Sequence, residues 1–237
     1  MAGTIVLVGA GEFLEGMAAV DRVLISRVPD PPARVAIVPT AAAQEDPRAW
    51  TDMGESHYRR LGAQVESVFV RDRETADDPA FASAILRANF VYMSGGSPGF
   101  LLESIRDTRT YAAMLDIYHR GGVLAGCSAG AMVLGGMTRV RRGGMPGPPQ
   151  PFSWDWAQGL GLLPQVIVAP HFDRMNEERL RGYRDGMPPG FVMLGIDEHT
   201  AAVGDGTHFE VMGRGAVTVF HGEGSVRYSV GEQFTIS

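Results

Sequence analysis

The chain has 237 residues, a formal net charge of −6 and 45% hydrophobic residues, as expected for a globular protein with one large core or two modest ones. Its 21 Lys and Arg residues are spread along the sequence and form no basic stripe, which argues against a nucleic-acid partner. The single cysteine, Cys127, excludes an intramolecular disulfide and a cysteine-based metal cluster.

Two segments bear on location. The N-terminus lacks a basic stretch followed by a long apolar core, so it indicates a first strand and not a signal peptide. The longest uncharged run, residues 121–138, contains six glycines and fits a strand, a turn and a helix better than a membrane span. We expect a cytoplasmic protein that does not enter a membrane.

Short β-branched runs alternate with amphipathic stretches over most of the chain. The predicted strands are residues 4–8, 34–38, 65–70, 89–93, 123–125 and 165–169, and the predicted helices are residues 14–25, 47–61, 79–86, 98–119 and 175–183. This alternation predicts an α/β fold, a doubly wound, mostly parallel sheet with helices on both faces.

The pattern changes after residue 190. Short strands are predicted at 191–196, 200–203, 208–212, 216–220 and 226–230, separated by glycine-rich turns that suit antiparallel hairpins at one edge of the sheet. No segment has the composition of a linker, so residues 1–237 are interpreted as a single domain. Residues 142–151, rich in Gly and Pro, form either a loop over the site or a plain connector.

The strongest motif is Gly126-Cys127-Ser128-Ala129-Gly130, between a predicted strand and a predicted helix. This context is typical of a nucleophile elbow, where a sharp turn exposes the central hydroxyl and small neighbours let strand and helix approach. The helix N-terminus also supplies backbone N–H groups where an oxyanion would form. The alternative is a junction that merely requires small residues. Under the elbow interpretation Ser128 is the nucleophile and Cys127 is a small buried residue.

Two further motifs belong at the same edge of the sheet. His171 follows a predicted buried strand, where catalytic groups of open α/β sheets gather, and it could accept the Ser128 proton. Ser94-Gly95-Gly96 ends the strand before that of Ser128, and we assign the Gly96 N–H as an oxyanion donor with that of Ala129. Both motifs have structural alternatives, a core histidine and a simple tight turn.

A third glycine motif, Gly9-Ala10-Gly11, follows the first strand and raises the question of a dinucleotide. The G-x-G-x-x-G pattern fails at Leu14, and no acidic residue closes the second predicted strand. We expect neither a nucleotide nor any other cofactor or metal.

With these motifs in place, the chain resembles the serine peptidase family of dipeptidase E and cyanophycinase, which is related in fold to class I glutamine amidotransferases. The resemblance rests on the Ser94-Gly95-Gly96 turn, the Ser128 elbow, Pro170-His171-Phe172 with Arg179-Leu180, and the run from Gly195 to Ala201. It implies Ser128 as nucleophile, His171 as its base, and hydrolysis of an amide bond in a small peptide, often next to an aspartyl residue, without metal.

The chain departs from this family in its acidic residue and in its substrate motifs. Gly144 stands where dipeptidase E has the triad aspartate, so Asp155, the only carboxylate between Ser128 and His171, is nominated by elimination, with Glu198 in reserve. Ser97-Pro98 replaces the Asp-Gln pair of cyanophycinases, which argues against a β-aspartyl-arginine polymer as substrate. Arg174 is the candidate for binding a substrate carboxylate.

The sequence therefore predicts a serine peptidase acting on small, aspartyl-containing peptides through a Ser128 acyl-enzyme. Two alternatives stay open: an amidase or acyl-transfer enzyme on a non-peptide amide, and a binding protein that has lost catalysis. The expected partner is a small peptide or amide, and a homodimer is compatible with the sequence.

Overall fold

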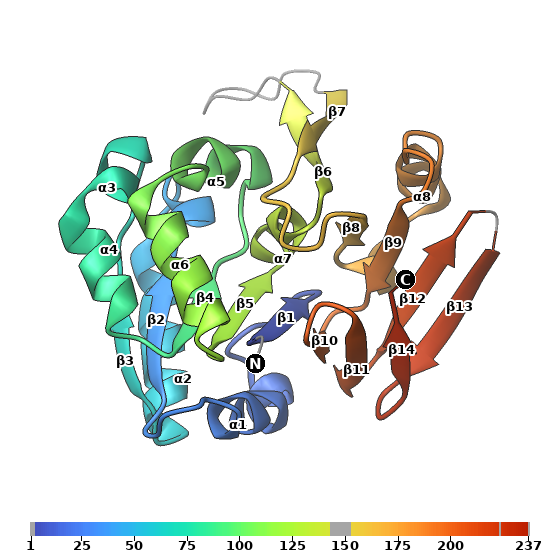
Figure 1. The fold of residues 1–237 in the computed structure, drawn as a ribbon. Helices are drawn as coiled ribbons and strands as arrows, with labels where there is room; N and C mark the ends of the chain where they lie inside the picture. Colours follow the sequence, from blue (N-terminus) through green and yellow to red (C-terminus); the bar gives the residue numbers. More distant parts are fainter. Residues whose placement is uncertain (1–2, 143–152, 223, 237) are drawn as a thin grey trace.

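The computed structural model describes residues 3–142, 153–222 and 224–236. Its main sheet has eight strands in the order β14-β11-β10-β1-β5-β4-β2-β3 (Figure 1). Five neighbours are mutually parallel: β1 (Thr4–Val8), β5 (Val123–Cys127), β4 (Phe90–Met93), β2 (Arg34–Val38) and β3 (Gln64–Ser67). The other three, β10 (Thr200–Gly204), β11 (His208–Gly213) and β14 (Gln233–Thr235), extend the sheet antiparallel beyond β1. The predicted α/β class with a mostly parallel central sheet is confirmed.

Helices cover both faces of this sheet (Figure 1). One face packs on α1 (Ala18–Ser26) and α2 (Pro47–Arg60), and the other on α4 (Pro79–Leu86), α5 (Pro98–Ile105), α6 (Arg109–His119) and α7 (Ala129–Leu134). Alternate side chains of β1 show why both faces are covered. Ile5 and Leu7 pack in the core beneath α4–α7, whereas Val6 and Val8 pack in the core beneath α1 and α2. Since successive side chains point to opposite faces, an all-apolar strand requires cover on both.

The predicted helix over residues 98–119 is interrupted. The chain leaves α5 at Arg106, and Asp107 adopts a left-handed backbone with φ of +56°. Thr108 then caps α6, its hydroxyl accepting a hydrogen bond from the Tyr111 N–H at 3.4 Å. A side-chain cap of this kind satisfies a backbone donor that a new helix leaves without a partner, so two helices replace the one expected. A five-residue helix, α3 (Arg73–Asp77), was not predicted.

A second sheet stands beside the first, in the order β13-β12-β9-β8. It contains β8 (Val166–Ala169), β9 (Val192–Ile196), β12 (Ala216–His221) and β13 (Gly224–Ser229), with α8 (Glu177–Arg184) between β8 and β9 in the chain. The expected hairpins at the edge of the main sheet are thus right for β10 and β11 and wrong for β9, β12 and β13. The physical reason is that β12 pairs with β9, and the buried Asp197 carboxylate after β9 accepts from the Ala216 N–H at 3.0 Å.

A hairpin of β6 (Met137–Arg142) and β7 (Ser153–Gln158) follows α7. Residues 143–152 of the predicted loop lie outside the described residues. Within the described ranges, none of the helices has both the length and the apolar character needed to cross a membrane.

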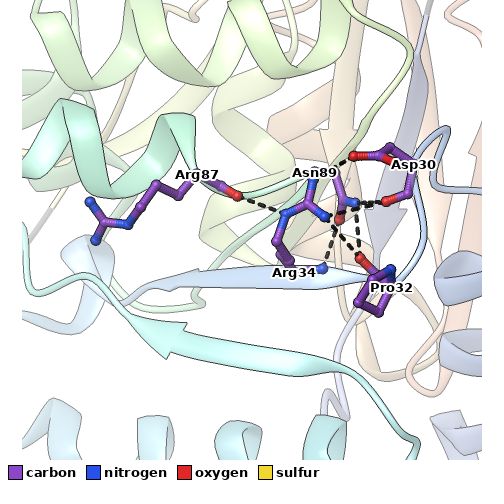
Figure 2. Close-up of polar contacts among 5 residues, drawn as sticks. All are labelled: Asp30, Pro32, Arg34, Arg87 and Asn89. Carbon is purple, nitrogen blue, oxygen red and sulfur yellow. Dashed lines mark hydrogen bonds and ion pairs between the residues drawn. The ribbon is translucent and has the colours of Figure 1, made fainter.

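The amino ends of the parallel strands are closed by a polar network, shown in Figure 2. The Arg34 backbone N–H at the start of β2 donates to Asn89 Oδ1 at 2.7 Å, and the Asn89 amide donates to the Asp30 carbonyl at 2.6 Å. The Arg34 guanidinium donates to the Arg87 carbonyl at 2.9 Å. These hydrogen bonds tie residues 30–34 to residues 87–89, so this edge has a structural role. The candidate active-site residues lie at the opposite edge, at the carboxyl ends of the strands.

Candidate active site

Ser128 lies at the carboxyl end of β5, at the point where the buried strand turns into α7. Its backbone has φ of +48° and ψ of −107°, a conformation that residues other than glycine rarely adopt. Hydrogen bonds on both sides hold this turn: the Ser128 N–H donates to the Val8 carbonyl at 2.9 Å, and the Ser128 carbonyl accepts from the Met132 N–H at 2.9 Å. The half-buried side chain projects from a packed strand, as a nucleophile elbow requires.

The two flanking glycines are required by packing. A Cβ on Gly126 would lie 2.3 Å from the backbone carbonyl carbon of Gly130, and one on Gly130 would lie 2.7 Å from the Met93 carbonyl oxygen. No side chain fits at either position, because strand and helix are in direct backbone contact. A nucleophile elbow and a purely structural strand–helix junction both require small residues here. The side chains that surround Ser128 therefore decide between the two interpretations.

His171 is the first of these neighbours. It follows β8 in a left-handed conformation with φ of +52°, and its Nε2 lies 3.1 Å from Ser128 Oγ. The loop that carries it is fixed by packing: Phe172 covers Gly195, where a Cβ would lie 2.5 Å from the ring, and Phe172 contacts Phe220 edge-on at 5.6 Å. The structure thus brings the two predicted residues together from different sheets.

The other ring nitrogen of His171 faces Glu198, the residue held in reserve. Nδ1 lies 2.7 Å from Glu198 Oε1, and the Glu198 side chain is only 13% exposed. Arg174 pairs with the second carboxylate oxygen at 2.8 Å, and the Glu198 backbone N–H donates to Asp173 Oδ1 at 2.8 Å. The Arg174 guanidinium thus holds the carboxylate, and Asp173 holds the backbone that carries it, in place beside the imidazole.

The remaining nominated residues lie elsewhere or in other contacts. Asp155 is on β7 of the hairpin, opposite Val140, and the place beside His171 Nδ1 that elimination assigned to it is occupied by Glu198. The nomination of Asp155 considered only carboxylates between Ser128 and His171 in the sequence, whereas Glu198 lies beyond His171. Arg174, expected at a substrate carboxylate, has its guanidinium on Glu198, with a side chain that is 71% exposed.

The glycine turn after β4 meets the elbow as expected. A Cβ on Gly95 would lie 3.5 Å from Ser128 Cβ, and Gly96 has φ of +130° with Ala41 packed against it. Within the described chain, no hydrogen bond uses the N–H of Gly95, Gly96 or Ala129. Backbone N–H groups without a partner, in this turn and at the start of α7, are the type of donor that an oxyanion site uses.

Sequence reasoning overlooked Glu12, which follows β1 in the segment considered for a dinucleotide. Its Oε2 accepts from the Cys127 thiol at 2.8 Å, and its Oε1 accepts from the Trp50 indole N–H at 2.9 Å. Burial, followed by the Glu12 charge, raises the pKa of the Cys127 thiol well above its usual value. Cys127 is completely buried, so it is a protonated packing group beside Ser128. Glu12 could have been found from the sequence, because it follows the predicted first strand at the carboxyl edge of the sheet.

The chain was compared with known proteins. The model of peptidase family S51 matches residues 5–212. Cyanophycinase of Synechococcus elongatus is 31% identical over 79% of this chain and 58% of its own length, so the chain spans less than two thirds of that relative. Cyanophycinase of Geminocystis herdmanii is 33% identical over 81% of this chain and 70% of its own length.

Solved structures agree with these matches. A crystal structure of a peptidase from an acI-B1 Actinobacterium superimposes with a TM-score of 0.85 and 29% identity, covering 100% of this chain and 98% of the other. A putative peptidase E protein from Listeria monocytogenes, at 15% identity and a TM-score of 0.60 over 98% of this chain and 100% of its own, shares the fold. The resemblance predicted from the motifs is confirmed: the chain belongs to peptidase family S51.

Proposed function

We propose that the protein is a serine peptidase that hydrolyses an amide bond of small peptides with Ser128, His171 and Glu198 as its triad. One observation carries the proposal: Ser128 Oγ, the His171 ring and the Glu198 carboxylate form a single hydrogen-bonded line, with distances of 3.1 and 2.7 Å. Ser-His-acid geometry of this kind is the arrangement that activates a serine hydroxyl, whatever the order of the three residues in the chain.

In this mechanism Ser128 Oγ attacks the peptide carbonyl carbon while its proton passes to His171 Nε2. The N–H groups of Ala129 and Gly96 donate to the oxyanion of the tetrahedral intermediate. The C–N bond then breaks, and Nε2 returns the proton to the leaving amine. Water attacks the ester, giving its proton to Nε2, and the acid is released with Ser128 restored.

Glu198 acts through His171. Its carboxylate accepts a hydrogen bond from the Nδ1–H group, which leaves Nε2 unprotonated toward Ser128 and stabilises the imidazolium that forms during attack. Arg174 is on the far side of that carboxylate. We therefore assign Arg174 to positioning Glu198 in place of the substrate-carboxylate role that its sequence position suggested.

The proposed substrates are small peptides, including aspartyl ones. The proposed reaction is hydrolysis of a peptide bond and of no other bond. Several similar proteins are named cyanophycinase. The sequence here has Ser97-Pro98 after the glycine turn, and Ser97 caps α5 by accepting from the Phe100 N–H at 3.2 Å. This structural use of Ser97 argues against a substrate-binding role at that position.

The test combines a fluorophosphonate probe with a substrate panel of Asp-X dipeptides, β-Asp-X dipeptides and simple amides. The wild type and Cys127→Ala should be labelled and should hydrolyse at least one dipeptide, whereas Ser128→Ala should do neither. Hydrolysis confined to simple amides would favour the amidase alternative. A wild type that is folded but neither labelled nor active would contradict the proposal.

A further inference from the structure

Asp197 and Glu198 are neighbouring carboxylates that bind different partners. Both lie in the loop between β9 of the second sheet and β10 of the main sheet. The Glu198 carboxylate faces His171, whereas the Asp197 carboxylate is buried, with a side chain that is only 4% exposed. The mechanism described above uses Glu198 and gives no role to the buried charge beside it.

The Asp197 carboxylate joins three segments of the second sheet. Its Oδ2 accepts from the Ala216 N–H at the start of β12, at 3.0 Å, and from Arg227 Nη2 on β13, at 2.6 Å. Gly215 lets these segments come so close, since a Cβ there would lie 2.7 Å from Asp197 Cβ. Within the described chain, Asp197 Oδ1 is buried without a hydrogen bond. The position of the carboxylate therefore depends on the contacts of one oxygen.

Arg227 is the cation that balances this buried charge. It comes from β13, the outer strand of the second sheet (Figure 1), and its side chain is 55% exposed. Its Nη1 donates to Thr218 Oγ1 on β12 at 3.4 Å, which directs the guanidinium toward Asp197. Among the described residues, no other cation forms an ion pair with Asp197. Removal of one partner from a buried ion pair is strongly destabilising, so the position of Asp197 depends on Arg227.

The loop transmits the position of Asp197 to Glu198. The Glu198 carbonyl accepts from Thr200 Oγ1 at 3.1 Å. The next residue, His199, has a left-handed backbone, and its N–H donates to the Ala10 carbonyl at 2.9 Å. Since the backbone after Glu198 is fixed in this way and Asp197 directly precedes it, a shift of Asp197 is taken up at Glu198.

We propose that the Asp197–Arg227 ion pair positions Glu198, and through it the imidazole of His171. This inference rests on the proposed function. Both members of the pair lie outside the line of Ser128, His171 and Glu198, so they are positioning residues. The contact of 2.7 Å between Glu198 and His171 stabilises the imidazolium during attack. A misplacement of about 1 Å at such a contact can lower a rate by about 100-fold. The outer hairpin of the second sheet thus contributes to the reactivity of Ser128.

The test measures inactivation by a neutral alkyl fluorophosphonate at several concentrations, which gives kinact and KI separately. Ser128 Oγ attacks phosphorus, fluoride leaves and the hydroxyl proton passes to His171, so kinact reports on the triad. Arg227→Met should lower kinact by about 10- to 100-fold, while KI stays near the wild-type value. Arg227→Lys keeps the charge and should restore a substantial part of kinact.

A double-mutant cycle separates positioning from a general loss of stability. In a Glu198→Gln background, Arg227→Met should lower kinact only slightly further, since residues that act as one unit give non-additive losses. Arg27→Met is the matched control, because it breaks the Arg27–Glu210 pair on β11 and should keep the wild-type kinact. Asp197→Asn removes the charge without leaving a buried carboxylate unpaired, which covers the case of an Arg227→Met protein that fails to fold. Its kinact should fall by at least about 10-fold.

The outcomes distinguish the two proposals. A wild type that loses reactivity in Glu198→Gln, but in neither Arg227→Met nor Asp197→Asn, would overturn the positioning role and leave the serine peptidase intact. Losses from Arg227→Met and Glu198→Gln that multiply in the double variant would overturn that role as well. A wild type that the probe does not label would remove the proposed function, and this inference with it.

Discussion

At the scale of single residues, the site concentrates backbone conformations that side chains rarely adopt. Ser128, His171 and His199 have φ of +48°, +52° and +55°, and each lies in a turn at the carboxyl end of a strand. A residue held in this way costs about 1–3 kcal/mol and persists only where its surroundings determine it. At Ser128 and His171 this conformation directs the two side chains toward each other. At His199 it lies in the loop that carries Glu198.

The assignment of Glu198 predicts an asymmetric response to two similar substitutions. Glu198→Gln keeps the shape of the side chain but removes the charge that orients His171, so peptide hydrolysis should fall by about 10³- to 10⁴-fold. Asp155→Asn, on the hairpin, should change the rate far less. Steady-state kcat/KM of the two purified variants provides the comparison, and a larger loss in Asp155→Asn would show that the acid is misassigned.

A second prediction at this scale concerns Cys127. The thiol is completely buried, and its raised pKa, caused by burial and then by Glu12, lowers the fraction of reactive thiolate at pH 8. Ellman's reagent should therefore react very slowly with the folded protein and with one thiol per chain once urea unfolds it. Rapid, complete reaction of the folded protein would contradict the described packing.

At the scale of elements, the unit of β5 and α7 depends on direct backbone contact. Gly126→Ala would place a methyl group 2.3 Å from the Gly130 carbonyl, and it should lower the free energy of unfolding by about 1–3 kcal/mol or more. Gly99→Ala in α5 is the matched control, since its added methyl meets only Val140 at 3.5 Å. Urea denaturation should show a lower midpoint for the first variant alone, and equal midpoints would be evidence against the close approach.

Elements also show where sequence reasoning was sufficient. The strands β1, β2, β4 and β8 were predicted to within one residue at each end, because short, mostly apolar runs between turn residues leave few other solutions. The break between α5 and α6 was missed although residues 106–110 are all polar and Thr108 carries a helix-cap signal. Strand pairing was harder: whether β12 joins β10 or β9 depends on distant partners such as Asp197, and not on its own residues.

At the scale of the whole molecule, the candidate site is assembled where two sheets meet. Ser128 comes from the main sheet, whereas His171 and Glu198 follow neighbouring strands, β8 and β9, of the second. The elbow and the histidine could be predicted because each has a local motif. Glu198 could not be chosen over Asp155 from local sequence, because the pairing of β8 with β9 is what brings its loop to His171.

The central claim is that Ser128 forms the covalent intermediate. The most direct measurement is mass spectrometry of wild-type protein after reaction with a fluorophosphonate, first intact and then as proteolytic peptides. We expect one adduct per chain, on the peptide that contains Ser128, and no adduct in Ser128→Ala. An adduct on another residue, or a folded wild type that remains unmodified, would contradict the account.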